Sequence, residues 1–259
     1  MSEHLSLRTS LIRSYMTDPA ACLFRYFKGL VVQPKSYTSL GRSTHEAAEH
    51  GNKYKKTSGK DAKVTVLQDV FNESWKKLVP VTKFSEDEDP IAIGDEGVHK
   101  LVPLFHERVY KKLEPLYVEE PFEMHIPELN ATITGTIDLV ETDHMIRDLK
   151  TKKRTPRWDE AIKSFQGKSY MAGYQAKFKK EPEGFLLDCL VRKKEAELVT
   201  TKPVSFSDLR NEEYMETVKM VIRNIRAGIF YPKREGNYFC ATAFCGFHEI
   251  CHKGAWMNL

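Results

Sequence analysis

The stretch ITGTIDLVETDHMIRDLKTKK, residues 133–153, decides the fold prediction because it contains two strand patterns joined by a short polar turn. In the first pattern, alternation places Asp138 on the face opposite Leu139, and in the second it places Asp148 and Lys150 on one face. If the two strands pair as a hairpin, the carboxyl groups of Asp138 and Asp148 lie close together.

Two interpretations of this hairpin are open. Two neighbouring carboxylates repel each other unless a cation lies between them, and oxygen ligands of this kind suit Mg²⁺ or Mn²⁺. Such a metal would lower the pKa of a bound water and polarise a phosphate, while Lys150 could orient that water. The alternative is a surface hairpin with two solvated acids, and Asp61-Ala62-Lys63 repeats the D-x-K tripeptide in a predicted loop.

Length and composition favour one large α/β domain. The chain has 259 residues, of which 41% are hydrophobic, which is enough for a packed core. The absence of a long apolar run and of a signal peptide predicts a cytoplasmic protein with no membrane partner. The net charge is only +4, but residues 147–180 contain eleven Lys or Arg against three acids, a balance that would attract a polyanion.

Periodicity predicts helices first, then a strand meander, and then alternating elements. A capping box from Ser43 to Glu46 predicts that a helix begins there, with His45 in its first turn. The remaining predicted helices are 8–29, a segment ending near 77, 94–113, 158–179 and 207–227, and the predicted strands are 117–126, 131–141, 145–150, 184–191 and 196–201. This order predicts a central mixed β-sheet flanked by helices, with a helical part at 1–115, a sheet part at 116–229 and an irregular Cys-rich tail at 230–259.

Four further polar residues are candidates for the same site. Gln166 and Tyr170 are four residues apart and share a helical face. A neutral imidazole at His45 is a possible third metal ligand, and Glu120 belongs to the strand before the hairpin. Taken singly, each of them is equally typical of an ordinary solvated surface.

In combination, these residues resemble a known motif series. The chain has Gly135 to Asp138 as G-x-x-D, Asp148 to Thr151 as D-x-K-T, and Gln166 to Tyr170 as Q-x-x-x-Y, after a helical His. It is similar in this order to the RecB-like exonuclease branch of the PD-(D/E)xK nuclease superfamily. The resemblance implies a restriction-endonuclease-like fold and a metal-dependent DNA nuclease. It implies that the metal ligands are His45, Asp138, Asp148 and the Leu149 carbonyl, and that the catalytic or supporting residues are Asp138, Asp148, Lys150, Gln166 and Tyr170.

The cysteines provide a separate comparison. Cys22 lies near the N-terminus, and Cys240, Cys245 and Cys251 lie near the C-terminus. This layout resembles the iron–sulfur-containing subset of the same branch, which includes CRISPR-associated and AddB-type nucleases, and implies a [4Fe–4S] cluster. The C-x4-C-x5-C spacing departs from the usual C-x2-C-x5-C. A structural Zn²⁺ held by cysteines alone or with His248 or His252, and plain buried thiols, are the alternatives.

The sequence therefore predicts a DNA exonuclease that degrades single-stranded DNA from an end. Lys152, Lys153, Arg154 and Arg157 follow the second strand directly and would bind the phosphate backbone without reading sequence. The alternatives are a catalytically silent DNA-binding or complex-forming protein of the same fold, and an endonuclease of the same superfamily.

Overall fold

The computed structural model describes residues 3–234, 240–242 and 244–254. The chain divides into two compact units, each built from segments that are distant in sequence. Unit 1 comprises Met1–Gln33, Phe122–Gly135 and Arg210–Leu259, and unit 2 comprises Pro34–Pro121 and Thr136–Leu209. Of the predicted tail at 230–259, residues 235–239, 243 and 255–259 lie outside the described part.

Within the described residues, six strands form one mixed sheet in the order β1-β3-β4-β5-β6, and β2 also pairs with β3. Their bounds are β1 (Leu5–Arg8), β2 (Pro115–Ile126), β3 (Ala131–Glu141), β4 (Met145–Lys152), β5 (Gly184–Val191) and β6 (Glu197–Thr200). β3–β4 and β5–β6 are antiparallel, whereas β1–β3 and β4–β5 are parallel. The predicted mixed sheet is confirmed, and β1 is the strand that the sequence prediction missed.

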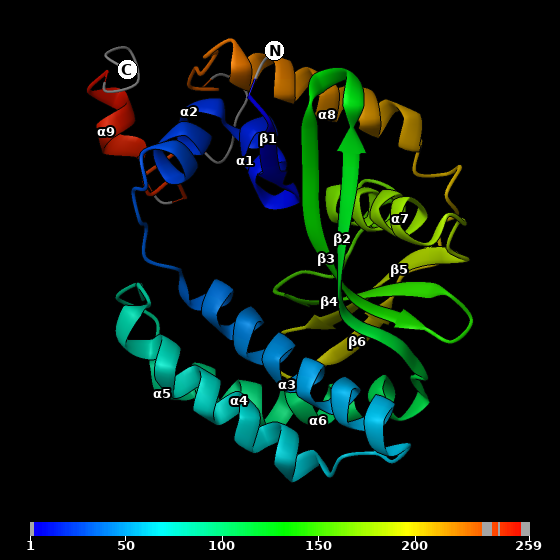
Figure 1. Ribbon diagram of the computed structural model, residues 1–259. Coiled ribbons are helices and arrows are strands. Elements are labelled where there is room, and N and C mark those ends of the chain that lie inside the picture. The colour runs from blue at the N-terminus through cyan, green and yellow to red at the C-terminus, as the bar shows by residue number, and fades with distance from the viewer. Residues whose placement is uncertain (1–2, 235–239, 243, 255–259) are drawn as a thin grey trace. The chain divides into compact units, whose positions relative to one another are not determined.

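In unit 2, β5 is covered on both faces, and all eight of its residues are buried. Helices lie on both sides of β4, β5 and β6 in this unit (Figure 1). On one side, α3 (Ser36–Ser58) contacts β4 and packs along α4 (Val64–Leu78), and α6 (Val102–Arg108) contacts β6. On the other side, α7 (Phe165–Phe178) contacts β5 and β4.

The helical side of unit 2 encloses an apolar core. Fully buried side chains from the helices, including Leu40, Leu67 and Phe71, join Leu139 of β3 and Leu149 of β4 in one cluster. The remaining helical elements are α5 (Pro90–Glu96), a π-helical turn at Gly97–Leu101 and 3₁₀ turns at Val79–Val81, Tyr110–Lys112 and Pro127–Leu129. The predicted helix at 94–113 is thus broken into α5, the π-helical turn and α6.

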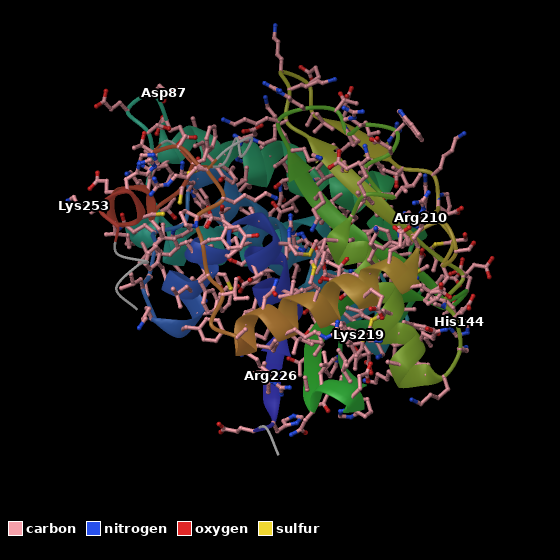
Figure 2. All side chains as sticks on the ribbon, turned by 90° about the horizontal axis from the view of Figure 1, so that it is seen from above. Asp87, His144, Arg210, Lys219, Arg226 and Lys253 are labelled. Carbon is pink, nitrogen blue, oxygen red and sulfur yellow. The ribbon has the colours of Figure 1, made fainter. Side chains whose placement is uncertain are left out.

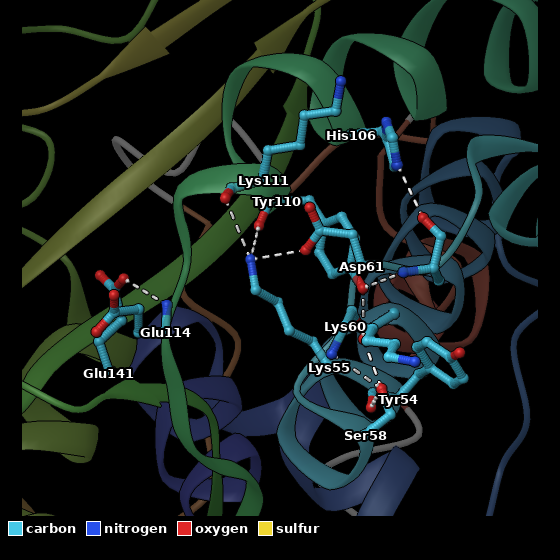
Figure 3. Close-up of polar contacts among 12 residues, drawn as sticks. Tyr54, Lys55, Ser58, Lys60, Asp61, His106, Tyr110, Lys111, Glu114 and Glu141 are labelled. Carbon is cyan, nitrogen blue, oxygen red and sulfur yellow. Dashed lines mark hydrogen bonds and ion pairs between the residues drawn. The ribbon is translucent and has the colours of Figure 1, made fainter.

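A partly buried polar clamp fixes α3 to the end of this helical layer. Lys55 donates hydrogen bonds to the carbonyl oxygens of Tyr110 and Lys111 at 3.2 and 3.1 Å and pairs with Asp61 at 2.9 Å (Figure 3). The Tyr110 hydroxyl donates to the Gly51 carbonyl oxygen at 3.0 Å. Because α3 carries His45, this clamp holds a residue of the candidate site on a rigid element.

The predicted start of this helix at Ser43 was wrong. α3 begins at Ser36, so His45 lies in its third turn, while Ser43 is buried and the Thr44 hydroxyl donates to the Leu40 carbonyl oxygen at 2.8 Å. The capping-box pattern misled because small polar residues also allow a helix to approach a sheet. A Cβ atom at Gly41 would lie 3.2 Å from the Thr151 hydroxyl oxygen of β4.

The helix predicted from Trp158 also begins later, at Phe165. Residues 157–164 form successive turns, including hydrogen bonds from the Glu160 amide to the Arg157 carbonyl oxygen and from the Lys163 amide to the Asp159 carbonyl oxygen. The Ser164 hydroxyl accepts a hydrogen bond from the Gly167 amide at 3.0 Å and therefore caps α7. Gln166 consequently lies in the first turn of α7.

Unit 1 contains β1, the first part of β3, and α1 (Thr9–Thr17), which contacts α8 (Asn211–Arg226). Lys219 and Arg226 project from α8 (Figure 2). Lys219 pairs with Glu128 at 2.9 Å, and Arg226 donates to the carbonyl oxygens of Glu3 and Asn130, each at 3.1 Å. These bonds link α8 to the N-terminal strand and to the turn between β2 and β3.

The predicted helix at 8–29 ends early, at Thr17. The Asp18 side chain accepts a hydrogen bond from the Ala21 amide and caps α2 (Pro19–Cys22), which continues as a π-helical turn at Leu23–Phe27. The C-terminal tail contains the short helix α9 (His248–His252). In the described part of the chain, no helix combines the length and the apolar character needed to cross a bilayer.

Candidate metal centre

The hairpin brings the two predicted acids together. β3 and β4 pair with Leu139 opposite Arg147, and one step further along this register Asp138 is opposite Asp148. One ligand atom from each of His45, Asp138 and Asp148 lies within 4.8 Å of the other two. All three residues belong to unit 2, two of them on the sheet and one on α3.

Asp148 is the most unusual residue of this group, because its side chain is 0% exposed. The Lys150 ammonium lies 2.9 Å from its Oδ2 atom, yet within the described residues neither carboxylate oxygen accepts a hydrogen bond. Burial, together with repulsion from Asp138, raises the pKa of Asp148 to about 7, although Lys150 opposes this shift. A buried carboxylate with unsatisfied oxygens is a position where a cation is expected.

His45 approaches the acid pair from α3. Its Nδ1 atom lies 3.7 Å from Asp138 Oδ2, and 34% of its side chain is exposed. Burial lowers the pKa of His45, although the charge of Asp138 and hydrogen bonding with the Leu149 backbone act in the opposite direction. A neutral imidazole is the form that binds a metal, and the contact with Leu149 brings the fourth predicted ligand residue to the same place.

A continuous chain of hydrogen bonds joins Lys150 to Asp138 through α7. The Lys150 ammonium donates to Gln166 Oε1 at 2.6 Å, and Gln166 Nε2 donates to the Tyr170 hydroxyl at 2.5 Å. The Tyr170 hydroxyl in turn donates to Asp138 Oδ1 at 2.6 Å. Burial and the nearby carboxylates raise the pKa of Tyr170, so it remains a donor. The structure therefore brings Gln166 and Tyr170 into contact with the predicted catalytic residues.

Two acids that the sequence prediction did not select lie beside this group. A cavity of about 30 Å³ is lined by His45 and Asp138 together with Glu49 of α3 and Glu119 of β2. Burial, and then the charges of Asp138 and Glu49, raise the pKa of Glu119 to about 7. A space of this size can accommodate about one water molecule.

Glu120, which the sequence analysis selected instead, accepts a hydrogen bond from Lys177 at 2.5 Å. Glu119 has a φ of +50°, so the extended backbone is interrupted there and simple alternation cannot assign the faces of the two acids. The sequence signal was the pair of adjacent acids before Pro121. It shows where on the strand an acid could approach the site, but not which of the two acids faces the site.

This donor set fits a hard divalent cation. Two carboxylates, one imidazole and a nearby backbone carbonyl are ligand types that Mg²⁺ or Mn²⁺ accepts, and the group contains no thiolate, the ligand that favours soft metals. His45, Asp138 and Asp148 are the residues that would hold the ion.

The basic residues that were predicted to bind DNA differ in their surroundings. Lys152 is partly buried and forms an ion pair with Glu160, and Arg157 pairs with Asp159 at 3.2 Å. Lys153 and Arg154 are exposed. The positive balance of residues 147–180 is therefore partly compensated, and Lys153 and Arg154 are the most accessible charges of the predicted run.

Another cation of this segment, Arg147, is also compensated. It donates to Glu141 at 2.8 Å and to both carboxylate oxygens of Asp188 at 2.9 and 3.1 Å. Burial opposes the charged form, but these acids still raise the pKa of Arg147. This arginine supports the sheet and is not available to a polyanion.

Cys245 and Cys251 pack with Ala20 and Phe24, which lie two residues on either side of Cys22 in the sequence. In the described part of the chain, no three thiol sulfurs lie within 4.8 Å of one another. Cys22 is buried and its thiol donates to the Leu11 carbonyl oxygen at 3.7 Å. Burial raises the pKa of Cys22 to about 12 and also raises the pKa values of Cys245 and Cys251. Thiols bind metals as thiolates, so a metal bound by these cysteines would displace their protons. Cys189, predicted as a core residue, is fully buried in β5.

The comparisons with known proteins agree with the fold. Residues 10–252 match the PD-(D/E)XK nuclease superfamily. Among solved structures, a "putative exonuclease" from Eubacterium rectale is similar with a TM-score of 0.59 and 12% identity, covering 97% of this chain and 88% of that one. A second structure, SSO0001, has a TM-score of 0.35 and 14% identity, covering 97% and 87%. The search of curated proteins gave no match.

The chain therefore belongs to the PD-(D/E)XK nuclease superfamily, with a mixed sheet flanked by helices. Membership of a nuclease superfamily implies a nucleic acid as substrate and a divalent metal as cofactor, and the group of His45, Asp138 and Asp148 is consistent with such a metal site.

Proposed function

We propose that this protein is a Mg²⁺- or Mn²⁺-dependent deoxyribonuclease of the RecB-like branch, acting as an exonuclease on single-stranded DNA. The observation that carries the proposal is Asp148, a fully buried acid with unsatisfied oxygens beside Asp138, His45 and Lys150. A purely structural hairpin would gain little from burying this carboxylate, because removing a charge from water costs stability even where one cation lies beside it.

The proposed roles follow from the contacts. His45, Asp138 and Asp148, with the Leu149 carbonyl, hold the divalent ion. When bound, that ion supplies the charge that activates water and stabilises the phosphorane-like transition state. Lys150 adds a positive charge next to Asp148, and its bond to Gln166 fixes the position of its ammonium group. Tyr170 fixes the carboxylate of Asp138 through the hydrogen bond to Oδ1.

The proposed substrate is single-stranded DNA with a free end. The order of the motifs in the sequence is that of RecB-like exonucleases, and one structural neighbour is described as a "putative exonuclease". Exposed Lys153 and Arg154 directly after β4 supply charge for a phosphate backbone. We also propose that the protein acts in the cytoplasm.

We propose in addition that Cys22, Cys240, Cys245 and Cys251 acquire a [4Fe–4S] cluster, with a zinc ion as the alternative. The support is the layout of the cysteines in the sequence, and the arrangement described above requires Cys22 to give up its hydrogen bond with Leu11. A brown protein with about four irons per chain supports the cluster, one zinc without iron supports the alternative, and neither metal excludes both.

The function is tested by digestion of end-labelled linear and closed circular single-stranded DNA with Mg²⁺ or Mn²⁺. An end-dependent enzyme degrades the linear strand and leaves the circle intact. Lys150→Ala and Asp148→Ala should abolish the activity, whereas Lys111→Ala, an exposed lysine in the same unit, serves as the matched control. Cleavage of circles favours an endonuclease, and an inert wild-type protein that binds DNA favours a catalytically silent relative.

A further inference from the structure

The loop between β4 and α7 carries an exposed tryptophan that the proposed site does not use. Trp158 is 83% exposed, although a large aromatic side chain is normally at least partly buried. The loop joins the strand that carries Asp148 and Lys150 to the helix that carries Gln166 and Tyr170. The exposed ring therefore belongs to the segment that connects the two main elements of the candidate site.

The exposure of Trp158 is not the result of a loosely held loop. Asp159 is buried and pairs with Arg157 at 3.2 Å and with Lys163 at 2.5 Å. Glu160 pairs with Lys152, and the turn is closed by the hydrogen bond from the Glu160 amide to the Arg157 carbonyl oxygen at 3.1 Å. The residues on both sides of Trp158 are thus fixed, and the indole is directed to solvent by a structured turn.

The surroundings of Trp158 identify the kind of partner. Lys153, Arg154 and Arg157 lie within five residues of Trp158 in the same loop and are exposed, so the loop presents positive charge near the ring in sequence. An apolar protein partner would require a contiguous apolar surface. An aromatic ring among cations is instead the arrangement that binds single strands, where the cations contact phosphates and the ring stacks on a base.

We propose that Trp158 stacks against an unpaired base of a single-stranded DNA substrate, while Lys153 and Arg154 contact the adjacent phosphates. This inference rests on the proposed nuclease function and names the element that selects single strands. The bases inside a duplex already stack on one another and have no free face for the indole, so the contact discriminates against duplex DNA.

The test measures binding of a labelled oligothymidine and of a duplex of equal length by fluorescence anisotropy, in EDTA so that cleavage does not interfere. Trp158→Ala should weaken single-strand binding by roughly ten-fold, as expected for the loss of one stacked base, with little effect on duplex binding. Trp158→Phe, which keeps a ring, should retain most of the affinity. Ile91→Ala, which removes another exposed apolar side chain (74% exposed) in the same unit, should change nothing.

A second readout follows the indole directly. The chain has three tryptophans, and Trp75 is buried, so the difference in emission between the wild type and Trp158→Phe reports on Trp158. This emission should be quenched by oligothymidine. The inference is overturned if Trp158→Ala binds single strands as well as wild type does, or if it loses affinity for duplex and single strands equally. In either case, cleavage of DNA by the wild type would leave the nuclease assignment intact. A wild type that cleaves no DNA would instead overturn the proposed function itself.

Discussion

The burial of Asp148 predicts that the candidate site is maintained at a cost in stability. Its pKa is about 7 in the folded protein, against the ordinary 3.8 of an aspartate in water. Between these values the folded state keeps a proton that the unfolded state has released, so the free energy of unfolding falls as pH rises towards 7. Asp148→Asn removes the titration and with it this contribution.

The magnitude follows from the shift. Between pH 5 and the folded pKa near 7, the carboxyl keeps its proton in the folded state but has lost it in the unfolded state. This window of about two pH units corresponds to about 3 kcal/mol at 1.36 kcal/mol per unit. Without metal, raising the pH from 5 to 8 should therefore increase the free energy of unfolding of Asp148→Asn by about 3 kcal/mol relative to that of wild type. For a chain of this length, that is a relative shift in Tm of roughly 6 to 12 °C.

The assay is thermal and urea unfolding of both proteins in EDTA at pH 5 and pH 8. Titration of groups remote from Asp148 cancels in the difference between the two proteins, and Asp87→Asn, in an exposed loop (Figure 2), is the control for loss of one acid. Adding Mn²⁺ at pH 8 should stabilise wild type by about 3 kcal/mol at one hundred times the dissociation constant, and Asp148→Asn much less. If the difference in free energy of unfolding between wild type and Asp148→Asn is the same at both pH values, the reasoning is refuted.

Three further predictions concern other parts of the site and fold. Tyr170→Phe should lower nuclease activity about ten-fold without unfolding the protein, because it removes the donor to Asp138; the Mn²⁺ dissociation constant, measured by calorimetry, should rise as well. Gly135→Ala should destabilise the protein by about 1 to 3 kcal/mol in urea unfolding, because the new Cβ would lie 2.4 Å from the Phe122 ring. If the cysteines bind a metal, Cys22→Ser should lower the bound iron or zinc measured by elemental analysis, whereas Cys189→Ser should not.

Local patterns were sufficient to predict the central part of the fold. The strands β3 and β4 alternate with period two and are joined by a short turn, so their faces and pairing follow from the sequence alone. That pairing is what brings Asp138 and Asp148 within reach of each other. The spacing of Gln166 and Tyr170 similarly fixed a shared helical face, and both residues join the same chain of hydrogen bonds.

Features that depend on tertiary contacts or on unusual backbone could not be predicted. Glu119 rather than Glu120 lines the cavity because the backbone at Glu119 has positive φ, which no pattern of polar and apolar residues reveals. The charge of the basic segment was overestimated for a related reason. Arg147 is neutralised by Glu141 and Asp188, and Asp188 is forty-one positions away in sequence.

The same reasoning explains why the small polar residues of α3 were misread and what they contribute. Ser43 and Thr44 look like the start of a helix when only the helix is considered, yet they, like Gly41, are interior positions of α3, and α3 contacts β4 of the sheet. A Cβ at Gly41 would already lie 3.2 Å from the Thr151 hydroxyl oxygen, so a larger side chain would push α3 away from β4. Because His45 is four residues, about one helical turn, from Gly41, such a displacement would also move its imidazole away from Asp138. The small residues therefore serve the site through packing, by allowing a ligand on a helix to reach acids on a sheet.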